Sequence, residues 1–199
     1  MKQTDFKIFP TQITHYRNFL SDVDIDSLRR FCMSYETGSH NMLTGNGRCS
    51  SGSERPLNYN DNILEGFTEI SNKLDIALNK YAETVGIEPI QLTNSWFNLQ
   101  SKGSITKQHN HPFSVVSAAL FINCPEGSNP LYFENPNPHV EFNYRLDEKE
   151  RSDSLHEYWY FVPQLGDLVV FPSWLKHGSM YNENNSLNRI VISMNTIRK

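Results

Sequence analysis

The chain has 199 residues, of which 38% are hydrophobic and 12% aromatic, and its formal net charge is -4. This length and apolar content suit a single domain with a sizeable core and exclude a globally disordered chain. The mildly negative charge disfavours nucleic acid as a partner, because nucleic-acid-binding proteins usually present a basic face.

The number and spacing of the cysteines and the N-terminal residues indicate in which cellular compartment the protein resides. The three cysteines are odd in number and widely spaced, with no Cys-x-x-Cys, so we expect neither a disulfide framework nor a structural zinc ribbon. The N-terminal residues lack the apolar core of a signal peptide, and no run reaches the roughly 18 apolar residues that a membrane span requires. We therefore expect a soluble cytoplasmic protein without a membrane partner.

A first helix is predicted to begin near Ser21. Asp22 and Asp24 would lie in its first turn, where the positive end of the helix dipole favours acidic side chains. Apolar residues then recur at helical spacing, at Ile25, Leu28, Phe31 and Cys32. The residues from 38 to 53 are rich in Gly, Asn and Ser and are expected to form a loop.

Residues 61–85 carry the clearest helical pattern in the chain. Their apolar stripe, less regular at Ile76, comprises Ile63, Phe67, Ile70, Leu74, Ile76, Leu78, Tyr81 and Val85. Acidic residues come early and lysines later, as the helix dipole favours, and Gly86 is expected to end the helix. We interpret this helix as a support for a sheet.

After Pro89 the pattern changes to short β-prone runs separated by Gly, Pro and Asn. These runs cover residues 96–100, 115–122, 131–133, 157–162, 168–171 and 189–194. Short strands without intervening helices favour a sandwich or jelly roll over a parallel α/β sheet.

We therefore expect a mainly β protein with N-terminal helices, in which a double-stranded β-helix (jelly roll) is buttressed by helices. Residues 1–90 would form the helical N-terminal part and residues 91–199 the β core of one domain. The charged residues 145–156 are expected to form a solvent-exposed loop.

Three histidines form a candidate metal site. Residues two apart on a strand face the same way, so His109 and His111 can both bind one ion. His177 follows an apolar strand and Pro172. It would lie in a turn at the same rim of the predicted barrel as His109 and His111. Imidazole suits iron, zinc, copper or nickel, and three imidazoles would leave coordination positions open, as catalytic metal sites do.

The remaining histidines are given no such role. A lone histidine is usually a surface residue or a satisfied core residue, and we interpret His15, His40, His139 and His156 in this way. A His-x-His pair alone is also a weak signal. The third histidine in Gly-Asp-Leu-x-x-Phe-Pro-x-x-x-x-His and an arginine twelve residues beyond it strengthen the metal hypothesis.

Arg189 opens an apolar strand, where an inward charge must be paired because burying it alone is costly. If Arg189 faces inward, Val191 and Ser193 share its face, and Ser193 can donate to the same anion. A guanidinium grips a carboxylate through two parallel hydrogen bonds. The alternative is that Arg189 lies at the rim of the predicted barrel and pairs with an acidic side chain on the surface.

These residues together resemble the Fe(II)/2-oxoglutarate-dependent oxygenase superfamily, and more narrowly its bacterial and phage members related to prolyl hydroxylases. The matching segments, which span roughly residues 94–196, are Ser95–Asn98, His109–Pro112, Ser117–Ile122, Pro125–Ser128, Gly166–Leu168, Phe171–Leu175, His177 and Arg189–Asn195. The N-terminal half carries no matching motif.

The resemblance implies a dioxygenase that uses Fe(II), 2-oxoglutarate and O2 to hydroxylate a substrate. His109 and His177 would be iron ligands, and Arg189 would bind the distal carboxylate of 2-oxoglutarate. Most of the superfamily has Asp or Glu at position 111. We expect His111 to complete a three-histidine metal site in its place, and the alternative is that water, chloride or an acidic residue from elsewhere in the chain fills this metal position. Asn98, which would share a strand face with Trp96 and Gln100, is our candidate for a hydrogen bond to the co-substrate or substrate.

Two other classes remain open. A cupin also uses three histidines, and the spacing from Gly103 to His111 matches its first motif, but Val115 and Val116 stand where that motif needs glutamate. A cupin also has no need of Arg189. The second alternative is a non-catalytic jelly-roll binding module, since a fold does not fix a function.

The sequence leaves the primary substrate unidentified and leaves room for a homodimer. The loops at residues 38–60 and 135–156 are expected to form the entrance and set selectivity, as loops on rigid scaffolds often do. Their polar, Asn-rich composition disfavours a lipid substrate.

Overall fold

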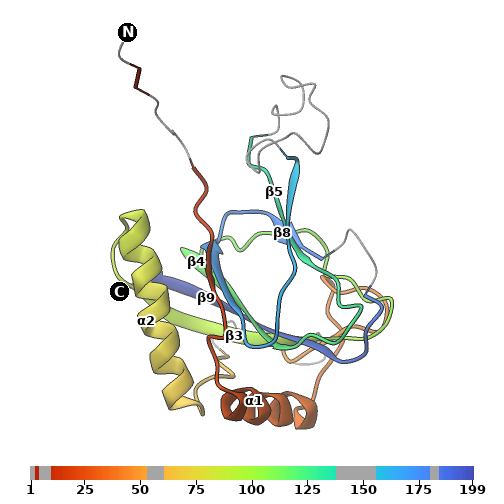
Figure 1. Cartoon of the computed structure of the whole chain (residues 1–199). Helices are drawn as coiled ribbons and strands as arrows, with labels where there is room; N and C mark the ends of the chain where they lie inside the picture. Colours follow the sequence, from red (N-terminus) through yellow and green to blue (C-terminus); the bar gives the residue numbers. More distant parts are fainter. Residues whose placement is uncertain (1–2, 5–9, 53–60, 138–155, 180–183) are drawn as a thin grey trace.

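The computed structural model describes residues 3–4, 10–52, 61–137, 156–179 and 184–199 (Figure 1). Its helices are α1 (Asp22–Ser34) and α2 (Thr68–Val85). Its strands are β1 (Thr14–Tyr16), β2 (Arg48–Cys49), β3 (Ile90–Gln100), β4 (Val116–Asn123), β5 (Leu131–Glu134), β6 (Tyr158–Phe161), β7 (Leu168–Pro172), β8 (His177–Gly178) and β9 (Arg189–Arg198). All but the last residue of the predicted loop at 145–156, most of the predicted loop at 135–156, and residues 53–60 of the predicted loop at 38–60 lie outside the described residues.

The strands form two antiparallel sheets. The larger sheet has the order β1-β7-β4-β9-β3-β2, and the smaller has the order β6-β5-β8. In Figure 1, α2 lies along one side of the larger sheet and α1 runs across its lower end. This mainly β jelly roll with helices outside the larger sheet confirms the predicted fold class.

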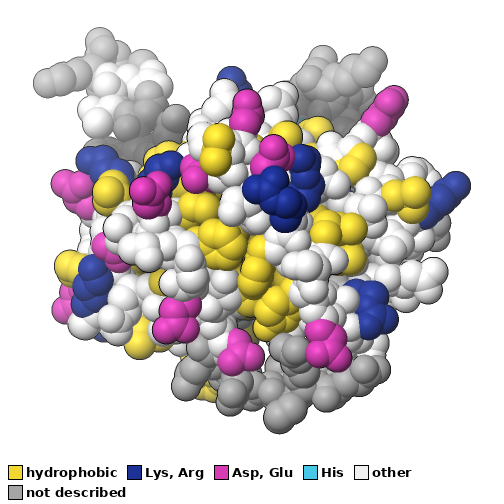
Figure 2. Space-filling model, turned by 90° about the horizontal axis from the view of Figure 1, so that it is seen from below, with side chains coloured by type: hydrophobic (Ala, Val, Ile, Leu, Met, Phe, Trp, Pro, Cys, Tyr) yellow, Lys and Arg dark blue, Asp and Glu magenta, His cyan; other side chains and the backbone are white. Residues whose placement is uncertain are grey.

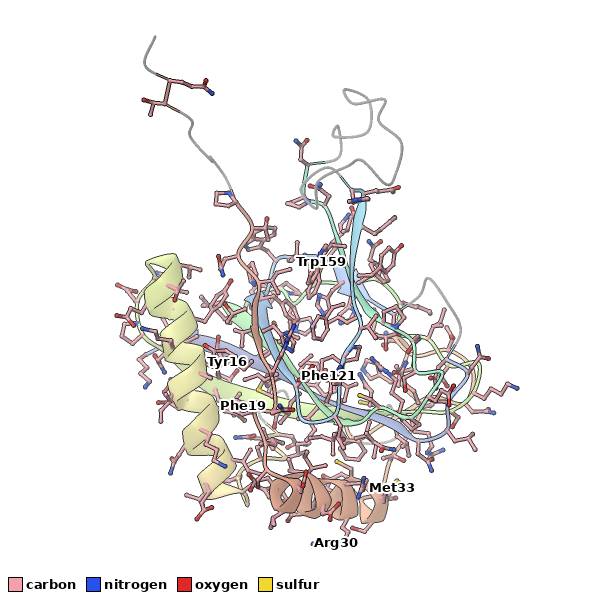
Figure 3. The ribbon with its side chains drawn as sticks, in the orientation of Figure 1. Tyr16, Phe19, Arg30, Met33, Phe121 and Trp159 are labelled. Atoms are coloured by element: carbon pink, nitrogen blue, oxygen red, sulfur yellow. The ribbon has the colours of Figure 1, made fainter. Side chains whose placement is uncertain are left out.

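Alternation along β4 divides the core into two layers. Val116, Ala118 and Leu120 join the cluster that includes the buried faces of α1 and α2. Ala119 and Phe121 point the other way and pack with residues of the smaller sheet. Figure 3 shows Phe121 inside, between the sheets, and Trp159 towards the smaller sheet. Since successive side chains of a strand face opposite sides, the face opposite the helices is the one available for a site.

The start of α1 follows the predicted pattern. Ser21 Oγ accepts a hydrogen bond from the Asp24 amide at 3.2 Å, and Asp24 Oδ2 accepts one from the Ser21 amide at 3.3 Å. This reciprocal capping box satisfies amides that have no partner within the helix. The outer side of α1 is not purely polar, because Val23 and Met33 are 77% and 51% exposed.

Figure 2 shows the molecule from this lower side, with hydrophobic side chains gathered among acidic and basic ones. Arg30 and Met33 of α1 point away from the sheet in Figure 3. The described part of the chain contains no helix that is both long and apolar enough to cross a membrane.

The second helix begins at Thr68, so the predicted start at Asp61 was wrong. The Ser95 amide donates to the Asp61 carbonyl oxygen at 3.0 Å, and Asn62 forms a bridge to Ser95 of β3. This tertiary pairing takes the backbone that the first helical turn would have needed, and Gly66, a poor helix former, follows. The end was predicted correctly, because Gly86 caps α2 in the left-handed region at φ 73°.

Replacing Leu74 by alanine should destabilise the protein by about 2–5 kcal/mol, because the change leaves a cavity in the core. Leu74 of α2 is 0% exposed, whereas Ile76 on the same helix is 72% exposed. Ile76→Ala is therefore the matched control, with an expected change within about 0.5 kcal/mol. Urea unfolding of both variants tests this difference, and equal effects would contradict the placement of α2.

Three short strands were not predicted. Residues of β1 pair with β7, those of β2 with β3, and those of β8 with β5. Each is two or three residues long, too short for an alternation pattern to show in the sequence. The last of them, β8, begins with His177 and so fixes one member of the candidate metal site.

Candidate metal centre

His109 and His177 face each other across an antiparallel bridge. The His109 amide donates to the His177 carbonyl oxygen at 3.0 Å, and the His177 amide donates back to the His109 carbonyl oxygen at 2.9 Å. In addition, β5 pairs with β8, which places Phe133 opposite His177. The two histidines therefore come together through backbone pairing between segments that are distant in the sequence.

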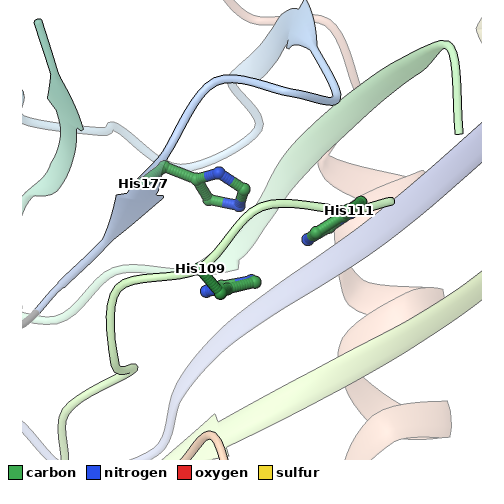
Figure 4. A group of neighbouring side chains, drawn as sticks. All are labelled: His109, His111 and His177. Carbon is green, nitrogen blue, oxygen red and sulfur yellow. The ribbon is translucent and has the colours of Figure 1, made fainter. Parts of the chain in front are cut away.

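His111 completes the group from the side of the larger sheet. Its amide donates to the Ser173 carbonyl oxygen at 2.9 Å, just after the end of β7. One ring nitrogen from each of His109, His111 and His177 lies within 4.8 Å of the others, and Figure 4 shows the three rings converging. Among the described residues, the structure thus brings together the three histidines that the sequence nominated.

Hydrogen bonds at Nδ1 leave the Nε2 atoms for a metal. His109 Nδ1 lies 2.8 Å from the Lys107 carbonyl oxygen, and His177 Nδ1 lies 2.8 Å from the Leu175 carbonyl oxygen. Because a carbonyl oxygen only accepts, each Nδ1 carries the proton and each Nε2 keeps its lone pair. His111 Nε2 is buried without a hydrogen-bond partner in the described structure. A metal ion would satisfy this otherwise costly buried atom.

Burial keeps the three rings neutral. It lowers the pKa of His111 to about 4 and lowers the pKa of His177 well below its ordinary value. Burial also lowers the pKa of His109, despite an opposing effect of its hydrogen bond to the Lys107 carbonyl oxygen. Since metals bind the neutral imidazole, the site is ready for a cation near neutral pH.

Metal binding at pH 6.5 should therefore release fewer than one proton per ion. Three histidines with ordinary pKa values near 6.5 would be half protonated and would release about 1.5 protons. Calorimetric titration with Zn(II) in buffers of different ionisation enthalpy measures this number. A release near the higher value would contradict the neutral, buried state of the site.

Arg189 is buried on the inner face of β9. Its side chain is 3% exposed, Nη1 donates to Gln100 Oε1 on β3, and its guanidinium carbon lies 5.8 Å from the centre of the Phe121 ring. Its Nε has no hydrogen-bond partner, and no described carboxylate forms an ion pair with Arg189. Burial lowers the pKa of Arg189 to about 10, so it remains a cation at neutral pH. The rim position considered from the sequence is thereby excluded.

A cavity of about 640 Å³ connects the histidines with Arg189. Its inner wall is largely apolar and includes Phe121, Leu131, Phe171 and Val191. Ser193 and Asn98 also line it, as expected from their strand faces. Near the mouth stand Trp96, whose ring centre lies 5.5 Å from that of His111, and Phe113, which is 99% exposed. A buried cation at an apolar end suits a ligand that carries a carboxylate on a short carbon chain.

His40 lines the cavity, although it was interpreted as an ordinary surface or core histidine; it lies in the loop that was expected to form the entrance. Its loop is held by a hydrogen bond of 2.8 Å from the Lys107 amide to the Met42 carbonyl oxygen. The Met42 amide in turn donates to His40 Nδ1 at 3.2 Å. By contrast, His15 Nε2 lies 2.9 Å from Asp167 Oδ2, and His15 does not line the cavity. His139 lies outside the described residues.

Comparison with known proteins assigns a family to these residues. A family model for 2OG-Fe(II) oxygenases, in which 2OG denotes 2-oxoglutarate, matches residues 94–195. This range contains His109, His111, His177 and Arg189, together with most of the cavity-lining residues of both sheets. No match was found among curated protein sequences.

Solved structures of other proteins share the fold of this chain. A 2OG-Fe(II) oxygenase family oxidoreductase from Burkholderia pseudomallei superposes with a TM-score of 0.64 at 9% identity, over 94% of this chain and 86% of that one. A prolyl-4-hydroxylase from Pseudomonas putida gives 0.53 at 15% identity, over 95% and 94%. HygX from Streptomyces hygroscopicus, solved with nickel and 2-oxoglutarate, gives 0.59 at 10% identity, over 95% and 84%.

Proposed function

The chain belongs to the 2OG-Fe(II) oxygenase family, and from this premise we propose that His109, His111 and His177 bind its iron while Arg189 binds 2-oxoglutarate. The protein is accordingly an Fe(II)- and 2-oxoglutarate-dependent oxygenase with O2 as the second co-substrate. When bound, iron and 2-oxoglutarate supply an O2-driven oxidation of a substrate C–H bond, with release of succinate and carbon dioxide. We propose hydroxylation as the outcome.

The convergence of three unprotonated ring nitrogens carries the metal assignment. His109 and His177 are held by backbone pairing and by their Nδ1 contacts, so their Nε2 atoms are aimed before any metal arrives. His111 Nε2 is buried without a partner beside them. All three ligands would be neutral, which leaves the metal site one charge more positive than a set with a carboxylate at position 111.

Arg189 supports the assignment of 2-oxoglutarate. Gln100 fixes one end of the guanidinium, while Nε has no partner among the described residues. A carboxylate in the apolar inner end of the cavity would pair this buried charge. Ser193, two positions along the same strand face, and Asn98 on β3 are our candidates for further hydrogen bonds to the co-substrate or substrate.

The protein's own residues would exclude water and orient the reactants. Phe121, Phe171 and Val191 line the inner end, where an anion–guanidinium pair is strengthened because few water molecules compete. The cavity is lined by Asn98 and His40 as well as by the aromatic Trp96 and Phe113, and the Asn-rich composition of the loops at 38–60 and 135–156 disfavours a lipid substrate. We propose no single primary substrate, because a small molecule, a protein side chain and a nucleobase are all compatible with the site, although the negative net charge disfavours nucleic acid as a partner. Measurement of the molecular mass in solution tests whether the chain forms a homodimer.

Anaerobic addition of Fe(II) and then 2-oxoglutarate tests the proposal. A visible charge-transfer band should appear only when both are present, because 2-oxoglutarate must chelate the iron to produce it. Slow formation of succinate on admission of O2 should follow. Iron binding without any response to 2-oxoglutarate would favour the cupin-like alternative, and failure to bind iron would favour a binding module.

A further inference from the structure

His111 lacks the partner that orients the other two histidines. His109 and His177 each use the carbonyl oxygen two residues earlier in the chain, from Lys107 and Leu175. For His111 the corresponding carbonyl belongs to His109, and its oxygen accepts the His177 amide at 2.9 Å. Among the described residues, His111 Nδ1 forms no hydrogen bond with this oxygen, so its acceptor comes from elsewhere in the fold.

Asn195 of β9 supplies this acceptor. The register of β4 and β9 places Ser117 directly beside Asn195, and Asn195 Oδ1 forms a short hydrogen bond with His111 Nδ1. Ser117 Oγ donates to the same Oδ1 at 2.8 Å. Ser117 Oγ also lies 2.8 Å from Ser173 Oγ and 3.0 Å from His111 Nδ1. Asn195, Ser117 and Ser173 are all buried.

One assignment of protons satisfies the whole group. Ser173 donates to Ser117, Ser117 donates to Asn195 Oδ1, and His111 Nδ1 donates to the same Oδ1. A carbonyl oxygen has two lone pairs, so Asn195 can accept both hydrogen bonds. The proton of His111 then resides on Nδ1, and the lone pair on Nε2 points towards the other histidines.

We propose that Asn195 is the positioning residue that fixes the tautomer and orientation of His111, so that histidine can bind metal where related enzymes have a carboxylate. This inference rests on the proposed function for its purpose, but the tautomer is a property of the metal-free protein. Asn195 acts through His111. It also lines the cavity, and no described residue accepts a hydrogen bond from its amide nitrogen.

The first test is nitrogen-15 NMR of the full chain with labelled histidine. Long-range couplings distinguish an Nδ1-protonated ring from an Nε2-protonated one. His111, assigned by the loss of its signals in His111→Gln, should show the Nδ1-protonated form. The Nε2-protonated form in the unaltered protein would overturn the proposal, whatever the variants do.

The second test compares three variants. Asn195→Leu removes the acceptor at similar volume, Asn195→Asp keeps an oxygen in place, and Asn94→Leu removes the cavity-lining asparagine that pairs with Asn195 across β3 and β9 but forms no hydrogen bond with a histidine in the described part of the chain. Asn195→Leu should give a mixture of His111 tautomers and weaken Co(II) binding about 10–100-fold, as losses of a partner behind a metal ligand do. Asn195→Asp should keep the single His111 tautomer and the Co(II) affinity of the unaltered protein. Asn94→Leu should change neither of these two properties.

The outcomes separate this inference from the proposed function. An unaltered protein that binds no Co(II) or Fe(II) contradicts the proposed function, while the NMR experiment still decides the role of Asn195. Normal Co(II) binding and an unchanged His111 tautomer in Asn195→Leu contradict the inference alone. If Asn195→Leu does not fold, Ser117→Ala provides a milder variant, which should loosen Asn195 and broaden the His111 signals.

Discussion

Replacement of His177 by alanine should abolish metal binding and, with it, the turnover of 2-oxoglutarate. His177 is 6% exposed and fixed by two backbone hydrogen bonds to His109, so no neighbouring group can move in to replace its ring. We expect Fe(II) affinity to fall by more than about 100-fold, since loss of a partner behind a ligand alone costs about 10–100-fold. Calorimetry with Co(II) and the anaerobic charge-transfer band measure the two effects.

The matched control for this change is His156→Ala. His156 is described by the structure but does not belong to the metal group, and its carbonyl oxygen accepts a hydrogen bond from Asn135. Its replacement should leave Co(II) affinity unchanged. Retention of tight metal binding by His177→Ala would show that the ion is held elsewhere, and the proposed site would then be wrong.

Arg189→Leu should weaken 2-oxoglutarate binding while leaving iron bound. Removing one partner of a buried, hydrogen-bonded charge pair costs about 2–5 kcal/mol, so the dissociation constant should rise roughly 30-fold or more. Arg189→Lys should retain part of the affinity, because lysine keeps the charge but loses the planar two-point grip. Titration of the charge-transfer band with 2-oxoglutarate gives both constants.

Arg198→Leu is the control on the same strand. Arg198 lies at the exposed end of β9, and its side chain is 72% exposed. Its Nη1 atom lies 3.6 Å from Glu88 Oε2. We expect no change in 2-oxoglutarate affinity. If Arg189→Leu also behaved like the unaltered protein, the buried cation would have a purely structural role, and the carboxylate of 2-oxoglutarate would bind elsewhere in the cavity.

The sequence predicted most of the architecture because its strongest signals are local. Short β-prone runs separated by Gly, Pro and Asn identified the strands from β3 to β9 that are longer than three residues, and the Ser21 cap and the Gly86 stop marked two helix ends. His177 could be nominated because it follows the apolar run of β7, and Arg189 because it opens β9. His109 and His111 were placed on one face by assuming a strand, but no strand includes them, and His109 forms only an isolated bridge with His177. Alternation along β9 and β3 placed Ser193 and Asn98 on the side of the cavity.

The parts that were missed depend on contacts between distant residues. The start of α2 is decided by Asn62 and Ser95, which belong to different elements, and not by the apolar stripe. His40 reaches the cavity because its loop is fastened at Lys107. Asn195 looked like one more polar residue at the end of an apolar strand, and only the register of β4 against β9 places it behind His111.

The mutual backbone bridge between His109 and His177 has a thermodynamic consequence. Because the ligands are already ordered, little conformational entropy should be lost when the ion arrives, and most of the binding free energy should appear as added stability. At a free metal concentration of 100 times Kd, this gain is about 2.7 kcal/mol. The amide hydrogens of His109 and His177 should then exchange with solvent more slowly, reporting metal loading from within the bridge itself.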